Sequence, residues 1–153
     1  MVKEAYFKLK KKYGFLPNFK ELNDEFEITT IENTDFIVRE IRRKIGEKFS
    51  SFMERLARTL QPETISISDF YEFRCFNSDE KKDLFNLFKE LRFQYRHFMH
   101  LDLLMDDKKE AEAIRDSLKF WKEFKKKLEP YFKSLEQCWA KEYKEKEILE
   151  YLG

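Results

Sequence analysis

One short stretch, RFQYRHFMH at residues 92–100, holds both histidines of the chain together with two arginines. Histidine can exchange a proton near neutral pH, and arginine can stabilise the negative charge of a phosphate group. Such a set could cleave RNA without a metal ion. His97 would handle a proton of the ribose 2′-hydroxyl or of the leaving oxygen, while Arg92 or Arg96 would stabilise the phosphate.

Arg92 and His97 are separated by four residues, which resembles the Arg-x-x-x-x-His signature of HEPN domains. HEPN domains are all-helical bundles of similar size, and many are dimeric, metal-independent ribonucleases. The resemblance therefore implies such a fold and activity, with Arg92 and His97 as the active pair. That family usually has a polar residue directly after the arginine, where this chain has Phe93. The other interpretation is that Arg92, Arg96 and His100 lie on the flank of a helix, and that His97 borders the core with its ring hydrogen-bonded. The ribonuclease is therefore our second hypothesis.

Metal binding is the other chemistry to consider. Cys75, His97, His100 and Cys138 are enough ligands for zinc, but structural zinc sites draw on closely spaced pairs, and only the histidines are close in sequence. A di-iron carboxylate bundle would need a Glu three residues before a His, and neither histidine has one. We therefore expect no metal and no other cofactor. Two cysteines so far apart do not form a disulfide framework, which predicts reduced thiols.

A second basic run lies between residues 39 and 48, in a segment that also carries regularly spaced apolar residues. The apolar residues take one side of the predicted helix, so the basic side chains are expected on the outward side. Part of their charge should be neutralised within the helix by Glu40 and Glu47. The candidate basic surface consists of Arg39, Arg42, Arg43, Lys44, Arg92 and Arg96.

Apolar residues recur every three or four positions over residues 35–60 and 78–105, which predicts two long amphipathic helices. Their similar length favours antiparallel packing. Only three Gly and three Pro occur in 153 residues, which leaves little turn material. We predict an all-α helical bundle that forms a single domain over residues 1–153, with the bundle itself in residues 35–150. Further helices follow from residue 107, and Pro130 allows either a kinked or a restarted helix.

Residues 1–31 are expected to form an N-terminal helical hairpin. Four residues at the turn, Gly14, Pro17, Glu21 and Leu22, resemble the opening of LexA-type helix-turn-helix domains. That resemblance implies DNA binding. The strongly acidic composition of residues 21–35 would repel phosphate and favours a hairpin that packs on the bundle instead.

The net charge of +1 argues against a generally basic nucleic-acid binder, yet the charge is unevenly spread. Residues 36–61 contain seven basic and three acidic residues, whereas residues 62–80 contain one basic and five acidic residues. We predict a non-enzymatic binding or adaptor protein whose basic helix faces contact an anionic partner, either a nucleic acid or an acidic protein. A homodimer is a further option. The chain shows no signal peptide and no membrane-spanning run, so a cytoplasmic location without a membrane partner is expected.

Overall fold

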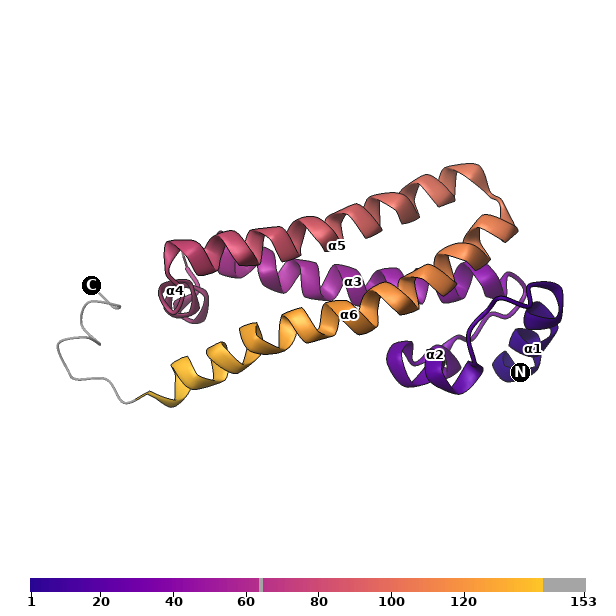
Figure 1. Cartoon of the computed structure of the whole chain (residues 1–153), viewed down its shortest axis with the longest axis horizontal. Helices are drawn as coiled ribbons and strands as arrows, with labels where there is room; N and C mark the ends of the chain where they lie inside the picture. Colours follow the sequence, from indigo (N-terminus) through magenta and orange to yellow (C-terminus); the bar gives the residue numbers. More distant parts are fainter. Residues whose placement is uncertain (64, 142–153) are drawn as a thin grey trace. The chain divides into compact units, whose positions relative to one another are not determined.

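The computed structural model describes residues 1–63 and 65–141, and these residues form helices and connecting segments without a strand (Figure 1). The prediction of an all-α helical bundle is confirmed. The elements in chain order are α1 (Val2–Lys12), α2 (Phe19–Phe26), the 3-10 turn η1 (Ile28–Thr30), α3 (Ile37–Leu60), α4 (Ile67–Arg74), α5 (Ser78–Leu104) and α6 (Asp107–Ala140).

The helices are divided between two compact units. The first unit contains residues 1–51 and 91–123, and the second contains residues 52–90 and the chain from residue 124 on. The long helices α3, α5 and α6 contribute to both units, and each unit has buried apolar side chains of its own. The single domain predicted for residues 1–153 stays a prediction, and the predicted bundle beyond residue 141 lies outside the described residues.

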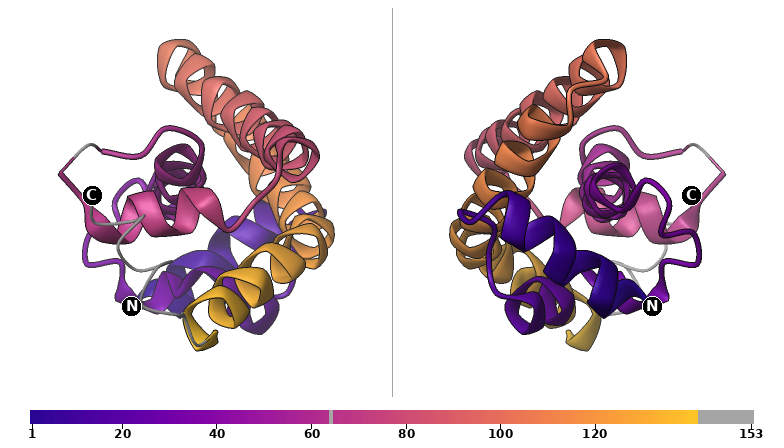
Figure 2. Two further views of the ribbon diagram at one scale, coloured as in Figure 1. Left: turned by 90° about the vertical axis from the view of Figure 1, so that its left-hand side faces the viewer. Right: turned by 90° about the vertical axis from the view of Figure 1, so that its right-hand side faces the viewer.

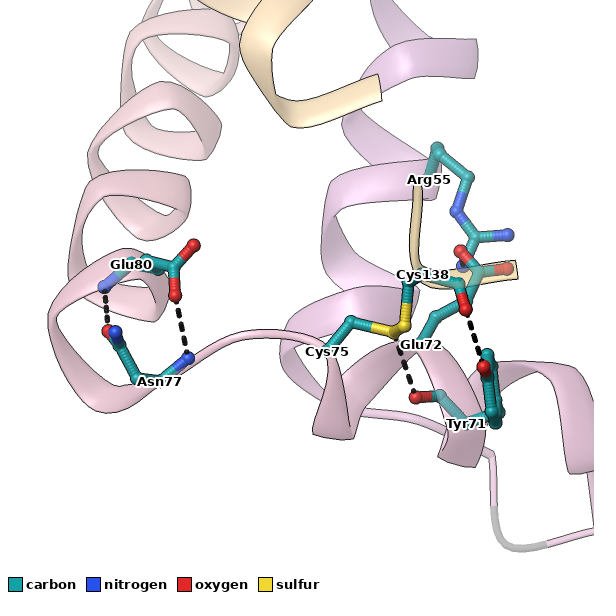
Figure 3. The surroundings of a disulfide bond; sticks show 7 residues. All are labelled: Arg55, Tyr71, Glu72, Cys75, Asn77, Glu80 and Cys138. Atoms are coloured by element: carbon teal, nitrogen blue, oxygen red, sulfur yellow. Dashed lines mark hydrogen bonds and ion pairs between the residues drawn. A yellow bond between two sulfur atoms is a disulfide. The ribbon is translucent and has the colours of Figure 1, made fainter. Parts of the chain in front are cut away.

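Helix α5 begins with a capping box formed by Asn77 and Glu80. The backbone N–H of Glu80 donates to Asn77 Oδ1 at 2.8 Å, and the N–H of Asn77 donates to the Glu80 carboxylate at 3.1 Å (Figure 3). These bonds satisfy two amides that a helix start would otherwise leave unpaired. Helix α5 ends at Leu104 because Met105 adopts a left-handed backbone conformation, with φ of 55°.

In the first unit, α3 and α5 pack as antiparallel helices. The stacked rings of Phe49 and Phe98 have centroids 5.7 Å apart, and Arg42, two turns earlier in α3, reaches Asp102, one turn later in α5. A side chain at Gly46 would meet the Phe98 ring, since a Cβ there would lie 3.3 Å from it. The missing side chain therefore allows the close approach of the two helices.

The hairpin predicted for residues 1–31 consists of α1, α2 and η1, which contact one another (Figure 2). Phe26 of α2 packs against Phe49 and Trp121, with ring centroids 6.3 Å from each. The indole N–H of Trp121 also donates to the Glu25 carboxylate at 2.9 Å. Aromatic packing and one polar bond therefore attach the hairpin to the core of the first unit.

Tyr6 supplies a buried polar bond between α1 and the turn that follows it. Its hydroxyl donates to the carbonyl oxygen of Pro17 at 2.6 Å, and burial raises the pKa of Tyr6 above its ordinary value of 10. The unfolded tyrosine ionises near that ordinary value and the folded one only at higher pH. This contribution to stability is therefore complete below pH 10 and is lost as the pH rises through the folded pKa.

We expect Tyr6→Phe to lower the free energy of unfolding by about 1 kcal/mol at neutral pH, because one hydrogen bond is lost. Above pH 10 the difference between the two proteins should shrink by up to about 1.4 kcal/mol per pH unit, because phenylalanine cannot ionise. Urea denaturation at several alkaline pH values measures both effects. A difference that stays constant with pH would contradict this role of Tyr6.

The second unit contains a disulfide between Cys75, at the end of α4, and Cys138, in the last turn of α6 (Figure 3). The prediction of reduced thiols is therefore wrong. The residues are 63 positions apart in sequence, but α4 lies against α6 and brings the two Cα atoms to 6.1 Å. The Tyr71 hydroxyl donates to the Cys138 carbonyl at 2.6 Å, and its ring packs on Trp139 with centroids 4.3 Å apart.

Helix α6 continues without interruption through Pro130, so the alternative that the helix ends and restarts there is wrong. Proline removes the N–H that would bond the carbonyl of Lys126. Both Lys126 and Pro130 are exposed, so water can solvate that carbonyl.

Candidate binding surface

Arg42 lies inside the first unit, and its predicted outward position is wrong. It is 3% exposed; its Nε donates to Glu110 at 2.7 Å, and Nη2 donates to Glu110 and Asp102. The guanidinium also lies over the Phe98 ring, 5.8 Å from its centroid. Burial alone would lower the pKa of Arg42, but the hydrogen bonds to the two carboxylates outweigh it and raise the pKa. Arg42 therefore ties α3 to α5 and α6.

The other three basic residues predicted on α3 also pair with carboxylates. The pairs are Arg39 with Asp107 at 3.1 Å, Arg43 with Glu40 at 2.6 Å and Lys44 with Glu47 at 3.8 Å. The last two are the intrahelical pairs expected from the sequence. Arg39 is half-buried and its Nε lacks a hydrogen bond, whereas Arg43 is exposed. Most of the α3 charge is therefore neutralised locally.

The acidic partners of Arg39 and Arg42 lie on either side of the turn between α5 and α6. Asp102 lies near the end of α5, and Asp107 and Glu110 lie in the first turn of α6. The sequence contained a hint of these ion pairs, since one helix begins with several arginines and a later turn is bordered by acidic residues. Sequence reasoning missed it because periodicity does not identify which helix ends meet.

The outward face of α5 in the first unit carries most of the other predicted residues. Phe93, Arg96, His97 and His100 have the spacing i, i+3, i+4 and i+7, so they share one side of the helix. All four are exposed, Phe93 to 73%. We call these four residues the α5 ridge. Residues 91–101 contain no Asp or Glu, so this part of α5 is free of acids.

More apolar surface surrounds the end of the α5 ridge. The apolar spacing over residues 78–105 would place Met105 on the buried side of the helix. That expectation is wrong, because Met99, Leu103, Leu104 and Met105 are all exposed. Helix α5 ends before Met105, so the helical spacing no longer determines where the Met105 side chain points. Arg96 Nη1 lies 3.1 Å from Met99 Sδ.

The basic residues of the α5 ridge, unlike the four predicted on α3, have no acidic partner among the described residues. Within residues 1–63 and 65–141, no carboxylate pairs with Arg96, His97 or His100. The Arg96 guanidinium therefore faces solvent without local neutralisation, and the two exposed imidazoles lie on the same side of the helix.

Arg92 and His97, the pair implied by the HEPN resemblance, both lie on α5. Arg92 is half-buried and His97 is exposed. Five helical positions separate them by about 140° around the helix axis. Arg96 is closer to His97 around the helix and shares the α5 ridge with it. The ribonuclease stays a hypothesis.

The cysteines and histidines do not offer four free metal ligands. Cys75 and Cys138 are bonded to each other in the second unit, and His97 and His100 belong to the first unit. Among the residues that the structure describes, no group of three or more His, Cys, Asp or Glu is arranged to hold a metal ion.

Comparison with known proteins gives no relative: no protein-family model, curated protein or solved structure matches this chain. In the described part of the chain, no helix has both the length and the apolar character needed to cross a lipid bilayer. Inferences about function therefore rest on the side chains of the α5 ridge.

Proposed function

We propose that this chain is a non-enzymatic helical binding protein that contacts an anionic partner through the α5 ridge. The proposal rests on the exposed Arg96 of the ridge, for which the described residues supply no carboxylate partner, and on the exposed His97 and His100 on the same side of the helix. Arg39 and Arg42, by contrast, are engaged in ion pairs between helices. A cationic helix face without local acids attracts anions, and this attraction weakens as salt is added.

Phe93 favours single-stranded nucleic acid as the partner. Its ring is 73% exposed and lies one helical turn from Arg96 and His97. Proteins that bind single strands combine aromatic side chains, on which bases stack, with cationic groups that contact phosphates. The exposed Met99 and Leu103 would pack against apolar side chains of an acidic protein segment, which is the alternative partner.

Fluorescence anisotropy with the full chain would test this function. The probes are labelled single-stranded RNA and DNA, duplex DNA and polyglutamate, each at about 50 mM and 200 mM salt. We expect the single strands to bind more tightly than the duplex, and to bind less tightly at the higher salt concentration. Binding of polyglutamate alone would indicate an acidic protein partner. No binding of any probe at low salt would refute the proposed function.

Two ridge variants should reduce binding without affecting the fold. Phe93→Ala should weaken single-strand binding by about 1–3 kcal/mol through the loss of stacking. Arg96→Gln should lower the slope of log affinity against log salt by roughly 0.7, the value for one phosphate contact on a single strand. The unfolding free energy of both should stay within about 0.5 kcal/mol of wild type, because both residues are exposed.

Arg43→Gln is the matched control, because Arg43 is an exposed arginine of the same unit that pairs with Glu40. We expect its affinity and its salt dependence to equal those of wild type. An equal loss in Arg43→Gln and Arg96→Gln would mean that binding depends on general charge and not on the α5 ridge.

The ribonuclease alternative is tested in the same samples. The RNA is incubated with the protein and a chelator, and its length is followed on a denaturing gel. Cleavage by wild type that disappears in His97→Ala would favour the enzyme, with Arg92 and His97 as its active pair. Intact RNA at every protein concentration would contradict the ribonuclease hypothesis and leave the proposal of a binding protein in place.

A further inference from the structure

The disulfide of the second unit is more accessible from Cys75 than from Cys138. Cys75 is partly exposed and lies in the short connection between α4 and α5, directly before Phe76 and the exposed Asn77. Cys138 is 5% exposed, and its carbonyl accepts the Tyr71 hydroxyl (Figure 3). We therefore expect a thiol in solution to reach Cys75 more easily than Cys138.

We infer that Cys75 is a site of reversible S-thiolation, at which a small thiol of the glutathione class opens the disulfide to Cys138. The attacking thiolate forms a new bond to Cys75 Sγ, and the bond between Cys75 and Cys138 breaks. The electron pair of that bond leaves with Cys138 Sγ, which takes a proton from solvent. One disulfide replaces another, so the step needs no further oxidant or reductant.

Tyr71 favours the reverse step, because it holds the last turn of α6 independently of the disulfide. Its hydroxyl bonds the Cys138 carbonyl at 2.6 Å, and its ring packs on Trp139. These contacts keep Cys138 next to Cys75 after the disulfide opens. The Cys138 thiolate can then attack Cys75 Sγ, expel the small thiol and restore the original bond.

Complete reduction would also leave Cys75 with a hydrogen-bond acceptor. Its Sγ lies 3.3 Å from the carbonyl oxygen of Tyr71, within reach of a weak S–H donor. A second thiol, attacking the mixed disulfide at its outer sulfur, would release this Cys75 thiol. The local structure therefore accommodates the disulfide, the mixed disulfide and the dithiol.

The inference is tested with the oxidised full chain and reduced glutathione. Samples are quenched with N-ethylmaleimide, digested and analysed by mass spectrometry. We expect glutathione on the Cys75 peptide and maleimide on the Cys138 peptide. Glutathione on Cys138, or in equal amounts on both cysteines, would overturn the inference, and so would the absence of any mixed disulfide.

Two single variants measure the same difference in accessibility. Cys138→Ser leaves only Cys75, and Cys75→Ser leaves only Cys138. With an aromatic disulfide reagent in native buffer, Cys75 should react at least about ten-fold faster, because thiol reactivity follows exposure. In urea the two rates should become similar. Similar rates in native buffer would also overturn the inference, provided that both variants keep their helical circular dichroism. If either variant is unfolded, the mass-spectrometry experiment on the wild-type chain decides.

Discussion

Replacing Arg42 with methionine should lower the free energy of unfolding by about 3–5 kcal/mol, because it leaves a buried carboxylate without its cation. Glu110 is 1% exposed and receives hydrogen bonds from both Nε and Nη2 of Arg42. Asp102 loses the same partner but is exposed, so water can solvate it. Methionine keeps much of the side-chain length, which separates the loss of charge from the creation of a large cavity. Urea denaturation followed by circular dichroism at pH 7 measures the change.

Two further variants make this prediction specific. The double variant Arg42→Met with Glu110→Leu removes both buried charges and should regain most of the lost stability. Arg43→Met breaks only the exposed pair with Glu40 and should cost less than about 1 kcal/mol. If Arg42→Met were no more harmful than Arg43→Met, the buried ion pair would not be the connection between helices that we describe.

Phe49→Ala should cost about 3–5 kcal/mol of unfolding free energy, because it opens a cavity in the core of the first unit. Phe49 is fully buried. Its ring lies 5.6 to 6.3 Å, between centroids, from those of Phe26, Phe98, Phe120 and Trp121. These neighbours come from α2, α5 and α6, so one side chain supports contacts among four helices. Thermal and urea denaturation measure the loss, and tryptophan fluorescence reports the change around Trp121.

Phe93→Ala is the control for this core substitution, because it removes the same ring from an exposed position of the same unit. Its unfolding free energy should stay within about 0.5 kcal/mol of wild type. If the two alanine variants were equally stable, Phe49 would not centre a packed core. Phe93→Ala thus serves both as a stability control and as a test of ligand binding, with opposite expectations.

The sequence alone determined where helices form, because helix formation depends on residues close together in the chain. The three- and four-residue spacing of apolar side chains predicted α3 and α5 nearly to their ends. The capping box of Asn77 and Glu80 was equally predictable, since both partners lie within one turn. For the candidate site, the sequence named Arg96 and His97, and both are exposed on α5.

Tertiary structure alone decided which charges face solvent and which cysteines meet. Arg42 has a basic side chain in an apparently outward run, yet it is buried because Asp102 and Glu110 lie opposite it. Cys75 and Cys138 become partners only because α4 lies against the last turn of α6. Helical spacing fixes the direction of a side chain around the axis of its own helix. The neighbour it meets depends on how helices distant in the chain pack, and that is a long-range property.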